Sequence, residues 1–475
     1  MTVPVPVVPT RARPDRARAV ALEALAAVRE RDAYANLVLP ALLRQRRLAG
    51  RDAGFATELT YGTLRWRGLL DAVIDACTDR PLDRIDPLVL DLLRLGGHQL
   101  LHMRVPSHAA VGETVTLARS GMKSSAAGFV NAVLRKISRR ELSDWVAAVA
   151  PDATVDPLGH LSIACSHPRW MVEAMQDALV VHAGVAVDDL TELAALLDAD
   201  NVPPRVTLVA RPGLATVDEL IGRGGKPGRF SPYAVVLPGG DPGDIPAIAQ
   251  GRAGVQDEGS QLTALALAAA AVDGRDERWL DLCAGPGGKA ALLAALAVER
   301  KGVLTAVEIS GHRTGLVREA LKAVGAGVEI RHADGREIGT SEPGAYDRVL
   351  LDAPCSGLGA LRRRPESRWR RTPSDLGELV LLQRQLLDSA MASVRVGGLV
   401  AYVTCSPHVS ETRGQVDAWL ADAVAGGPDG VRATLVDARP LFPGVPDLGD
   451  GPTVQLWPHR HGTDAMFLAL LRRDN

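Results

Sequence analysis

The sequence predicts a doubly wound α/β domain with a mostly parallel sheet, preceded by an all-α helical domain. Apolar residues recur every three or four positions between residues 15 and 140, and no alternating strand pattern interrupts them. From about Gln256 onward, apolar runs of strand length alternate with helical segments, which indicates a parallel sheet with right-handed crossovers. A length of 475 residues is enough for two to four domains.

The composition is that of an ordinary globular protein, with 47% hydrophobic and 23% charged residues. Five scattered cysteines are too few for a disulfide framework and favour a reducing compartment. No apolar run is long enough to span a bilayer, and prolines interrupt the N-terminal apolar residues where a signal peptide needs a continuous core. We therefore expect a monomeric cytoplasmic protein without a membrane partner.

The first part of the chain divides into a disordered tail over 1–14 and a helical bundle over 15–140. Apolar periodicity predicts helices within residues 17–28, 37–45, 55–76, 87–101 and 109–119. Residues 11–140 hold 22 Lys and Arg against 13 Asp and Glu, whereas the rest of the chain has an excess of acidic residues. A basic domain on an acidic body is typical of nucleic-acid binding, although many basic helical domains bind none.

The second part begins with a linker over 141–165 and a small mixed α/β subdomain over 166–255, with a strand predicted at 205–210. The doubly wound domain then occupies 256–475. It contains five predicted strands, each with a polar residue at or near its end. They cover residues 279–284, 303–309, 328–334, 346–353 and 398–405.

A glycine-rich turn follows the first of these strands, which also carries Asp281. The turn reads Cys283, Ala284, Gly285, Pro286, Gly287, Gly288 and Lys289. Such a turn lets backbone N–H groups approach a ligand at a helix N-terminus. Because the order fits neither the dinucleotide nor the P-loop fingerprint, and Asp281 disfavours a polyanion, the turn favours a cationic ligand.

Two more carboxylates follow the next two strands. Glu308 ends the second strand, where a carboxylate reaches ribose hydroxyls, and Asp334 closes the third, where it could bind an adenine amino group. Each acid alone is more often a solvated strand end, but three of them beside one glycine turn favour a nucleoside cofactor. An adenosyl ligand with a positive sulfur, S-adenosylmethionine, fits best.

Two cysteines follow the fourth and fifth strands, in Asp352-Ala353-Pro354-Cys355 and Thr404-Cys405. A buried cysteine is usually inert, and a disulfide is an alternative, but two cysteines at the ligand-binding edge favour nucleophilic chemistry. Without a C-x-x-C pattern we expect no metal. A thiolate that adds to carbon 6 of a pyrimidine activates carbon 5 for methyl transfer, and Asp352 is placed to assist at N3. Cys77 and Cys165 are expected in the core, and Cys283 beneath the glycine turn.

An arginine-rich segment follows the first cysteine. Arginines grip phosphates and a tryptophan stacks on bases, so the segment favours RNA contact over an ordinary solvated loop. The candidate RNA-binding residues are Arg362, Arg363, Arg364, Arg368, Trp369 and Arg370.

The motifs DLCAGPGGK, LLDAPCSGLG and VTCSPHVSETRGQV resemble those of the Sun/Fmu-type RNA cytosine-5 methyltransferases, a Rossmann-like family. The helical segment, with AYANLVLP, ELTYGTLRWR and FVNAVLRKI, is similar to the antitermination factor NusB. The resemblance implies methylation of carbon 5 of a cytosine in 16S ribosomal RNA of the small subunit.

The resemblance also implies roles for individual residues. Cys405 would be the nucleophile, and Cys355 would assist product release. Apart from the resemblance, Lys289 is a further candidate catalytic residue, because it is one of only six lysines in the chain and lies in the glycine turn. The cofactor would lie against Cys283 to Lys289, Glu308, Asp334 and Asp352, and Asp352 would also face the cytosine.

Two departures from the family pattern exist. The usual D-G-F-F reads Asp464-Ala465-Met466-Phe467, and the region before Arg211 lacks R-V-N. Rival functions are DNA cytosine methylation, which the single T-C-S motif disfavours, and RNA binding by an antitermination factor with a degenerate methyltransferase body. The intact glycine turn and both cysteines disfavour the second.

Overall fold

The computed structural model describes residues 14–222, 224–425 and 430–475. The predicted tail at 1–14 therefore lies almost entirely outside the described residues. The described chain forms two compact units. The helical unit contains the described residues up to Val172 together with Arg363–Arg370, and the sheet unit contains Glu173–Arg362 and Arg371–Asn475.

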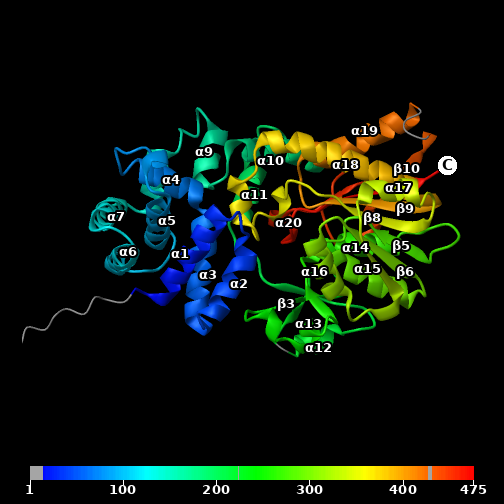
Figure 1. Cartoon of the computed structure of the whole chain (residues 1–475). Helices are drawn as coiled ribbons and strands as arrows, with labels where there is room; N and C mark the ends of the chain where they lie inside the picture. The colour runs from blue at the N-terminus through cyan, green and yellow to red at the C-terminus, as the bar shows by residue number, and fades with distance from the viewer. Residues whose placement is uncertain (1–13, 223, 426–429) are drawn as a thin grey trace, which may run out of the picture. The chain divides into compact units, whose positions relative to one another are not determined.

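The helical unit is a bundle, as the apolar periodicity predicts (Figure 1). Its larger core contains fully buried Leu69, Leu93, Val130 and Leu134, which come from three different helices, with Val130 and Leu134 four positions apart on one of them. Pro87 is the first residue of its helix, where its missing N–H costs little, and the side chain of Asp86 caps the N-terminus. The main helices are α1 (Arg16–Glu30), α2 (Ala35–Gln45), α3 (Gly50–Arg65), α4 (Arg67–Asp75), α5 (Pro87–Leu101), α6 (Ser107–Gly121) and α7 (Ser124–Ile137).

The expected linker over 141–165 is more ordered than its proline and glycine content suggests. It contains the helices α8 (Leu142–Val149) and α9 (Pro157–Ala164). Trp145 is buried against the bundle and donates from its indole N–H to the carbonyl of Ile137 at 2.9 Å. The segment therefore extends the helical unit.

The sheet unit begins with two helices and a small antiparallel sheet. Residues 166–255 contain α10 (Arg169–Ala183), α11 (Leu190–Asp200) and a four-stranded sheet in the order β2-β3-β1-β4. Short helices α12 (Val217–Ile221) and α13 (Pro246–Ala249) pack on its own small core. Its strands are β1 (Thr207–Ala210), β2 (Lys226–Pro227), β3 (Ala234–Val236) and β4 (Ala253–Val255).

The large sheet has the order β10-β12-β9-β8-β5-β6-β7, with β11 (Val454–Gln455) paired to β12. Five neighbouring strands are parallel, and β10 (Ala433–Val436), β11 and β12 (Phe467–Arg473) add antiparallel pairings. The parallel strands are β5 (Arg278–Asp281), β6 (Val303–Glu308), β7 (Val328–His332), β8 (Tyr346–Asp352) and β9 (Val394–Thr404). This arrangement confirms the predicted fold class.

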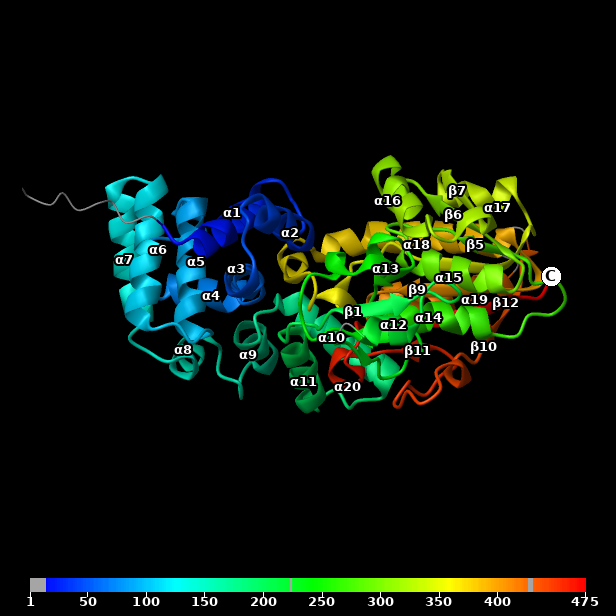
Figure 2. The ribbon, with the colours of Figure 1, turned by 90° about the horizontal axis from the view of Figure 1, so that it is seen from below.

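Helices cover both faces of the large sheet (Figures 1 and 2). One face packs on α14 (Glu258–Ala269) and α15 (Gly288–Glu299), and the other on α18 (Pro373–Ser393) and α19 (Arg413–Val424). Neighbouring residues of β9, such as Ala401 and Tyr402, therefore belong to different cores. Burial on both faces explains why these strands are continuous apolar runs.

Candidate active site

The candidate site lies at the carboxyl edge of the parallel strands, where the strand order reverses between β8 and β5. Such a reversal leaves a crevice outside the strand ends in doubly wound folds. The fold brings the glycine turn after β5 and the two cysteine turns after β8 and β9 to this one edge.

The glycine turn after β5 holds its shape through close backbone approach. The N–H of Ala284 donates to the carbonyl of Val307 at 2.9 Å, and the N–H of Gly285 donates to Glu308 Oε2 at 3.1 Å. A Cβ at Gly285 would lie 2.2 Å from Glu308 Oε2, so only glycine fits there. Gly287 has a φ of +110° and precedes Gly288, the first residue of α15.

Glu308 is buried at the end of β6, and its carboxylate has several partners. Besides Gly285, the N–H of Ser310 donates to it at 2.7 Å, and Arg313 Nη2 lies 2.8 Å from Oε1. Arg313, on the helix after β6, is a site residue that the sequence patterns do not predict. These contacts fix Glu308 beside the glycine turn, as its position in the sequence predicts.

Asp334 follows the neighbouring strand β7 and is paired locally. Arg336 Nη2 lies 2.6 Å from Asp334 Oδ2, and the N–H of Arg336 donates to Oδ1 at 2.9 Å. The guanidinium holds the pKa of Asp334 below its ordinary value. Asp334 is thus an ionised carboxylate at the third strand end.

Asp281, the last residue of β5, is a buried carboxylate at this edge. Burial, reinforced by the negative charge of Asp352, raises the pKa of Asp281 to about 8. Its Oδ1 accepts from the N–H of Cys283 at 3.3 Å, whereas its Oδ2 has no hydrogen-bond partner among the described residues. A buried carboxylate oxygen without a donor fits a ligand that carries a positive charge.

Cys283 lies in the turn itself, close to these carboxylates. Burial, together with the negative charge of Asp281, raises the pKa of the Cys283 thiol well above its ordinary value. An unreactive neutral thiol is consistent with the lining role expected for it.

Lys289 and Asp352 form an ion pair at the strand reversal. Lys289 Nζ lies 2.9 Å from Asp352 Oδ2, and the lysine side chain is almost completely buried. Burial opposes its charge, but Asp352 and, more weakly, Cys405 and Asp281 raise the pKa of Lys289 above its ordinary value. The ammonium is therefore charged beside Cys405, where it can stabilise a thiolate.

The two predicted catalytic cysteines are in direct contact. Their sulfur atoms, Cys355 Sγ and Cys405 Sγ, lie 3.5 Å apart, and both residues are partly exposed. The hydrogen bond with Cys405, followed by burial, raises the pKa of Cys355 well above its ordinary value. The Cys355 thiol is therefore neutral beside the sulfur of Cys405.

The remaining cysteines lie away from this pair in the way the sequence suggests. Cys77 and Cys165 are buried in the helical unit, with exposed fractions of 2% and 6%. All five cysteines are thiols and not disulfides.

The arginine-rich segment is mostly occupied by contacts within the protein. Arg362 is buried in the sheet unit, where Nη2 lies 3.2 Å from Asp464 Oδ1 and also donates to the carbonyl of Gly462. This ion pair gives Asp464, the first residue of the motif that departs from the family pattern, a structural partner.

The rest of that segment packs in the helical unit. Arg368 has an exposed fraction of 0% and donates to the carbonyls of Arg65 and Ser166 at 3.1 and 3.2 Å. Trp369 donates to the carbonyl of Leu64, and Arg370 donates to that of Ala33. The prediction of direct RNA contact is corrected here for Arg362 and Arg368, because their burial leaves no surface for a phosphate.

Arg364 remains exposed, and its guanidinium stacks over the Tyr34 ring at 5.3 Å from the centroid. Arg363, Trp369 and Arg370 are half-buried. RNA binding stays a prediction for the accessible side chains, of which Arg364 is the most exposed.

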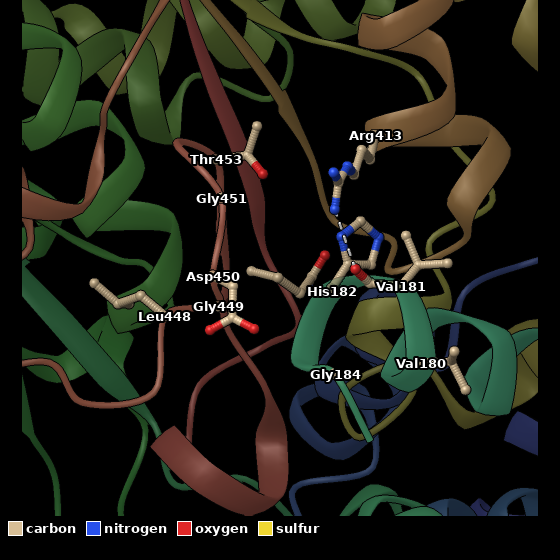
Figure 3. A pocket seen from close by; sticks show the side chains of 11 residues that line it. Val180, Val181, His182, Gly184, Arg413, Leu448, Gly449, Asp450, Gly451 and Thr453 are labelled. Atoms are coloured by element: carbon tan, nitrogen blue, oxygen red, sulfur yellow. Dashed lines mark hydrogen bonds between the residues drawn. The ribbon is translucent and has the colours of Figure 1, made fainter. Parts of the chain in front are cut away.

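A separate hollow of about 220 Å³ lies elsewhere in the sheet unit (Figure 3). In the figure, Arg413 lies beside the His182 ring and donates to the carbonyl of Val181 at 3.4 Å. Burial lowers the pKa of His182 to about 4, so its ring is neutral, and it contacts Thr412 Oγ1 at 2.9 Å. None of the predicted site residues lines this hollow, so it is distinct from the cysteine edge.

Two further findings concern metal ions and membranes, and a third concerns residues behind the cysteine turns. Among the described residues, no group of histidine, cysteine and carboxylate side chains could hold a metal ion. No helix of the described chain is long and apolar enough to cross a membrane. Glu411 and Gln383, which lie behind the cysteine turns, are not predicted from the sequence, where no local pattern distinguishes them from other polar residues.

The fold of the large sheet and the matching family model together identify a methyltransferase domain. The family model described as 16S rRNA methyltransferase RsmB/F matches residues 269–472, and the NusB family model matches residues 15–139. The chain belongs to this family of 16S ribosomal RNA methyltransferases and carries a NusB-like helical domain.

Relatives match the chain along nearly its whole length. A Mycobacterium tuberculosis protein named "Putative methyltransferase" is 56% identical over 98% of this chain and 98% of its own. The ribosomal RNA small subunit methyltransferase B of Pseudomonas syringae pv. tomato is 34% identical over 85% of this chain and 86% of its own. The crystal structure of PH0851 has the same fold, with a TM-score of 0.77 and 22% identity over 96% of this chain and 99% of that one.

Proposed function

We propose that this protein transfers a methyl group from S-adenosylmethionine to carbon 5 of a cytosine in 16S ribosomal RNA. The observation that carries the proposal is the pair of cysteine sulfurs 3.5 Å apart, beside the Lys289–Asp352 ion pair at the strand reversal. Membership of the ribosomal RNA methyltransferase family supports the substrate class. We expect the protein to act in the cytoplasm as a monomer and without a metal ion.

The residues after β5, β6 and β7 suit the proposed cofactor. Asp281, with an unpartnered buried oxygen, would face its positive charge, and Glu308 and Asp334 would bind its ribose and adenine. The turn from Cys283 to Lys289 and the carboxylate of Asp352 would complete the site. When bound, S-adenosylmethionine supplies a methyl group on a positively charged sulfur, which is the electrophile of the reaction.

The cysteine pair suits covalent catalysis on a pyrimidine, whose carbon 5 is a poor nucleophile by itself. The Cys405 thiolate forms a bond to carbon 6, and the Lys289–Asp352 pair delivers a proton through Asp352 to N3, so that electron density moves to carbon 5. Carbon 5 then forms a bond to the methyl carbon as the bond from that carbon to the cofactor sulfur breaks, and the sulfur leaves as a neutral thioether. Lys289 stabilises the thiolate before attack.

Release requires removal of the proton at carbon 5, after which the electron pair expels Cys405 from carbon 6. Cys355 lies next to the sulfur that must leave and can exchange a proton with it. We therefore assign Cys405 as the nucleophile and Cys355 as the residue that assists release.

The test measures incorporation of labelled methyl groups into 16S ribosomal RNA from a strain that lacks the gene, followed by bisulfite sequencing. We expect transfer to one or a few cytosines by the native protein. Cys405→Ala should abolish transfer, with a loss of at least about a thousandfold, because the raised pKa of the neighbouring Cys355 keeps that thiol neutral and a poor nucleophile.

Cys355→Ala should accumulate a covalent protein–RNA adduct that is visible as a band of reduced mobility in a denaturing gel. Cys165→Ala, a buried thiol of the helical unit, is the control and should behave as the native protein. An adduct formed by Cys405→Ala instead would reverse the two assignments, and RNA binding without any methyl transfer by the native protein would reject the enzyme.

A further inference from the structure

Glu411 is a fully buried carboxylate directly behind the two cysteine turns. It ends a short turn, η7 (Val409–Glu411), that follows β9. Its Oε1 accepts from the N–H of Ser356 at 2.7 Å and from Gln383 Nε2 at 3.2 Å. Its Oε2 accepts from Ser356 Oγ at 2.5 Å and from Ser406 Oγ at 2.6 Å. Four donors therefore converge on one carboxylate.

Three of the four donors come from the residues that follow the two cysteines, and the fourth is the side chain of Gln383. Ser356 is next to Cys355, and Ser406 is next to Cys405, fifty positions away in the sequence. The two hydroxyl oxygens lie only 3.1 Å apart, and both contact the same carboxylate oxygen. Because each hydroxyl has one hydrogen to give, a shared acceptor satisfies both at once.

A second group of contacts fixes Glu411 itself. Tyr402 donates from its hydroxyl to the backbone carbonyl of Glu411 at 2.8 Å. Gln383, on α18, donates to the carbonyl of Pro354, immediately before Cys355, at 2.9 Å. Tyr402 and Gln383 also contact each other at 3.2 Å. Glu411 is thus held by Tyr402 of β9 and Gln383 of α18, two elements that both belong to the core of the sheet unit.

Other links between the two cysteine turns are fewer. The backbone N–H of Gly359 donates to the carbonyl of Cys405 at 2.9 Å, and the thiols contact each other. Glu411 is the side chain that contacts both turns at once, through the backbone N–H and hydroxyl of Ser356 and the hydroxyl of Ser406.

We propose that Glu411 is a positioning residue, whose carboxylate holds the turns of Cys355 and Cys405 in the relative position that addition and release require. The inference rests on the proposed function for its catalytic consequence. The structural part of the proposal, which is the separation of the two sulfur atoms, can be measured without any methyl transfer.

The test uses Glu411→Gln, which keeps the side-chain shape but replaces the acceptor Oε2 with an N–H donor. One of the two serine hydroxyls must then turn away or lose its partner. The matched control is Asp347→Asn, because Asp347 is also fully buried and also accepts four donor groups, but lies at the amino end of β8.

The first readout is binding of phenylarsine oxide, a trivalent arsenical. It forms two arsenic–sulfur bonds with a pair of neighbouring thiols, and its oxygen leaves with both thiol protons as water. Cys355→Ala should abolish this binding and so identify the thiols. We expect Glu411→Gln to weaken binding at least tenfold, about 1.4 kcal/mol, and Asp347→Asn to change it less than twofold.

The second readout is single-turnover methyl transfer together with the dissociation constant of S-adenosylmethionine. A positioning role predicts at least a tenfold slower transfer step in Glu411→Gln with a cofactor dissociation constant within twofold of the native value. A general loss of structure would change both, and the urea midpoint of each variant checks the fold. Absence of transfer by the native protein would reject the proposed function and leave the arsenical result to decide the geometry.

Ser406→Ala provides the answer if Glu411→Gln does not fold. It removes one of the four donors and keeps the carboxylate, so we expect a three- to tenfold loss in both readouts. Arsenical binding within twofold of native in the folded variant, whether Glu411→Gln or Ser406→Ala, would overturn the proposal.

Discussion

Asp281 shows at the scale of one residue how the site balances stability against ligand binding. Its pKa of about 8 means that the folded protein keeps a proton that an unfolded chain, with a pKa of 3.8, releases. Between pH 4 and pH 8 the folded state therefore binds more protons than the unfolded state. Stability from this group falls as pH rises through that window, and the loss is complete above pH 8.

Asp281→Asn should remove this penalty, because a neutral amide has no proton to lose. We expect the variant to be more stable than the native protein by about 1–3 kcal/mol at pH 8 and nearly equal to it at pH 4. Urea unfolding at the two pH values measures the difference. Equal stability of the two proteins at pH 8 would contradict the raised pKa.

The same variant should bind the proposed cofactor more weakly. A positive ligand favours the ionised carboxylate, so native affinity should rise as pH increases from 6 to 8, by at most about tenfold for each pH unit. Asp281→Asn should lose this pH dependence and bind at least tenfold more weakly at pH 8. Titration calorimetry with S-adenosylmethionine provides the measurement.

Among the elements of the fold, the glycine turn after β5 is constrained by the close approach of its backbone to Glu308, and this constraint is stronger than helix propensity. Gly285→Ala would place a methyl group against Glu308, whereas a Cβ at Gly315, on α16 (Gly311–Leu321), meets nothing within 4 Å. We expect Gly285→Ala to weaken cofactor binding at least tenfold. Gly315→Ala should leave binding unchanged and raise stability by about 0.5–1 kcal/mol, because alanine favours a helix.

The arginine-rich segment gives a second prediction at this scale, in which neighbouring arginines behave differently. Arg368→Ala should destabilise the protein by about 2–4 kcal/mol, because the carbonyls of Arg65 and Ser166 lose a buried charged donor. Arg364→Ala should change stability by less than about 0.5 kcal/mol and instead weaken RNA binding. Urea unfolding and filter binding separate the two effects, and a destabilised Arg364→Ala would contradict the assignment.

At the scale of the whole molecule, the net charge of −2 conceals two regions of opposite sign. In the helical unit, exposed arginines gather around the end of α2 and the start of α3, at Arg44, Arg47 and Arg51. RNA binding through such a surface releases counterions, so affinity should fall steeply with salt.

Replacing Arg44, Arg47 and Arg51 together by alanine should lower the slope of log affinity against log salt by about 2, or roughly 0.7 for each lost phosphate contact. Arg439→Ala is the control, because Asp437 already neutralises that charge at 2.8 Å. Fluorescence anisotropy with a 16S ribosomal RNA fragment gives the slopes. An unchanged slope in the triple variant would place the RNA on another surface.

The sequence by itself determined the parts of this protein that depend on local pattern. Periodicity predicted the helical bundle and the five parallel strands, and three motifs predicted the glycine turn and both cysteines. It also suggested the helical and doubly wound fold class, because apolar spacing records which faces are buried.

Only the tertiary structure decided which of these residues meet. Glu411 is an ordinary acid in the sequence, and its contact with residues beside both cysteines arises because β8 and β9 are neighbours. Arg362 and Arg368 are predicted from the sequence as phosphate ligands. The fold instead buries Arg362 against Asp464 and a backbone carbonyl, and Arg368 against two backbone carbonyls. Spacing along the chain cannot show such contacts, since they depend on long-range packing and on the burial that sets each group's charge and partners.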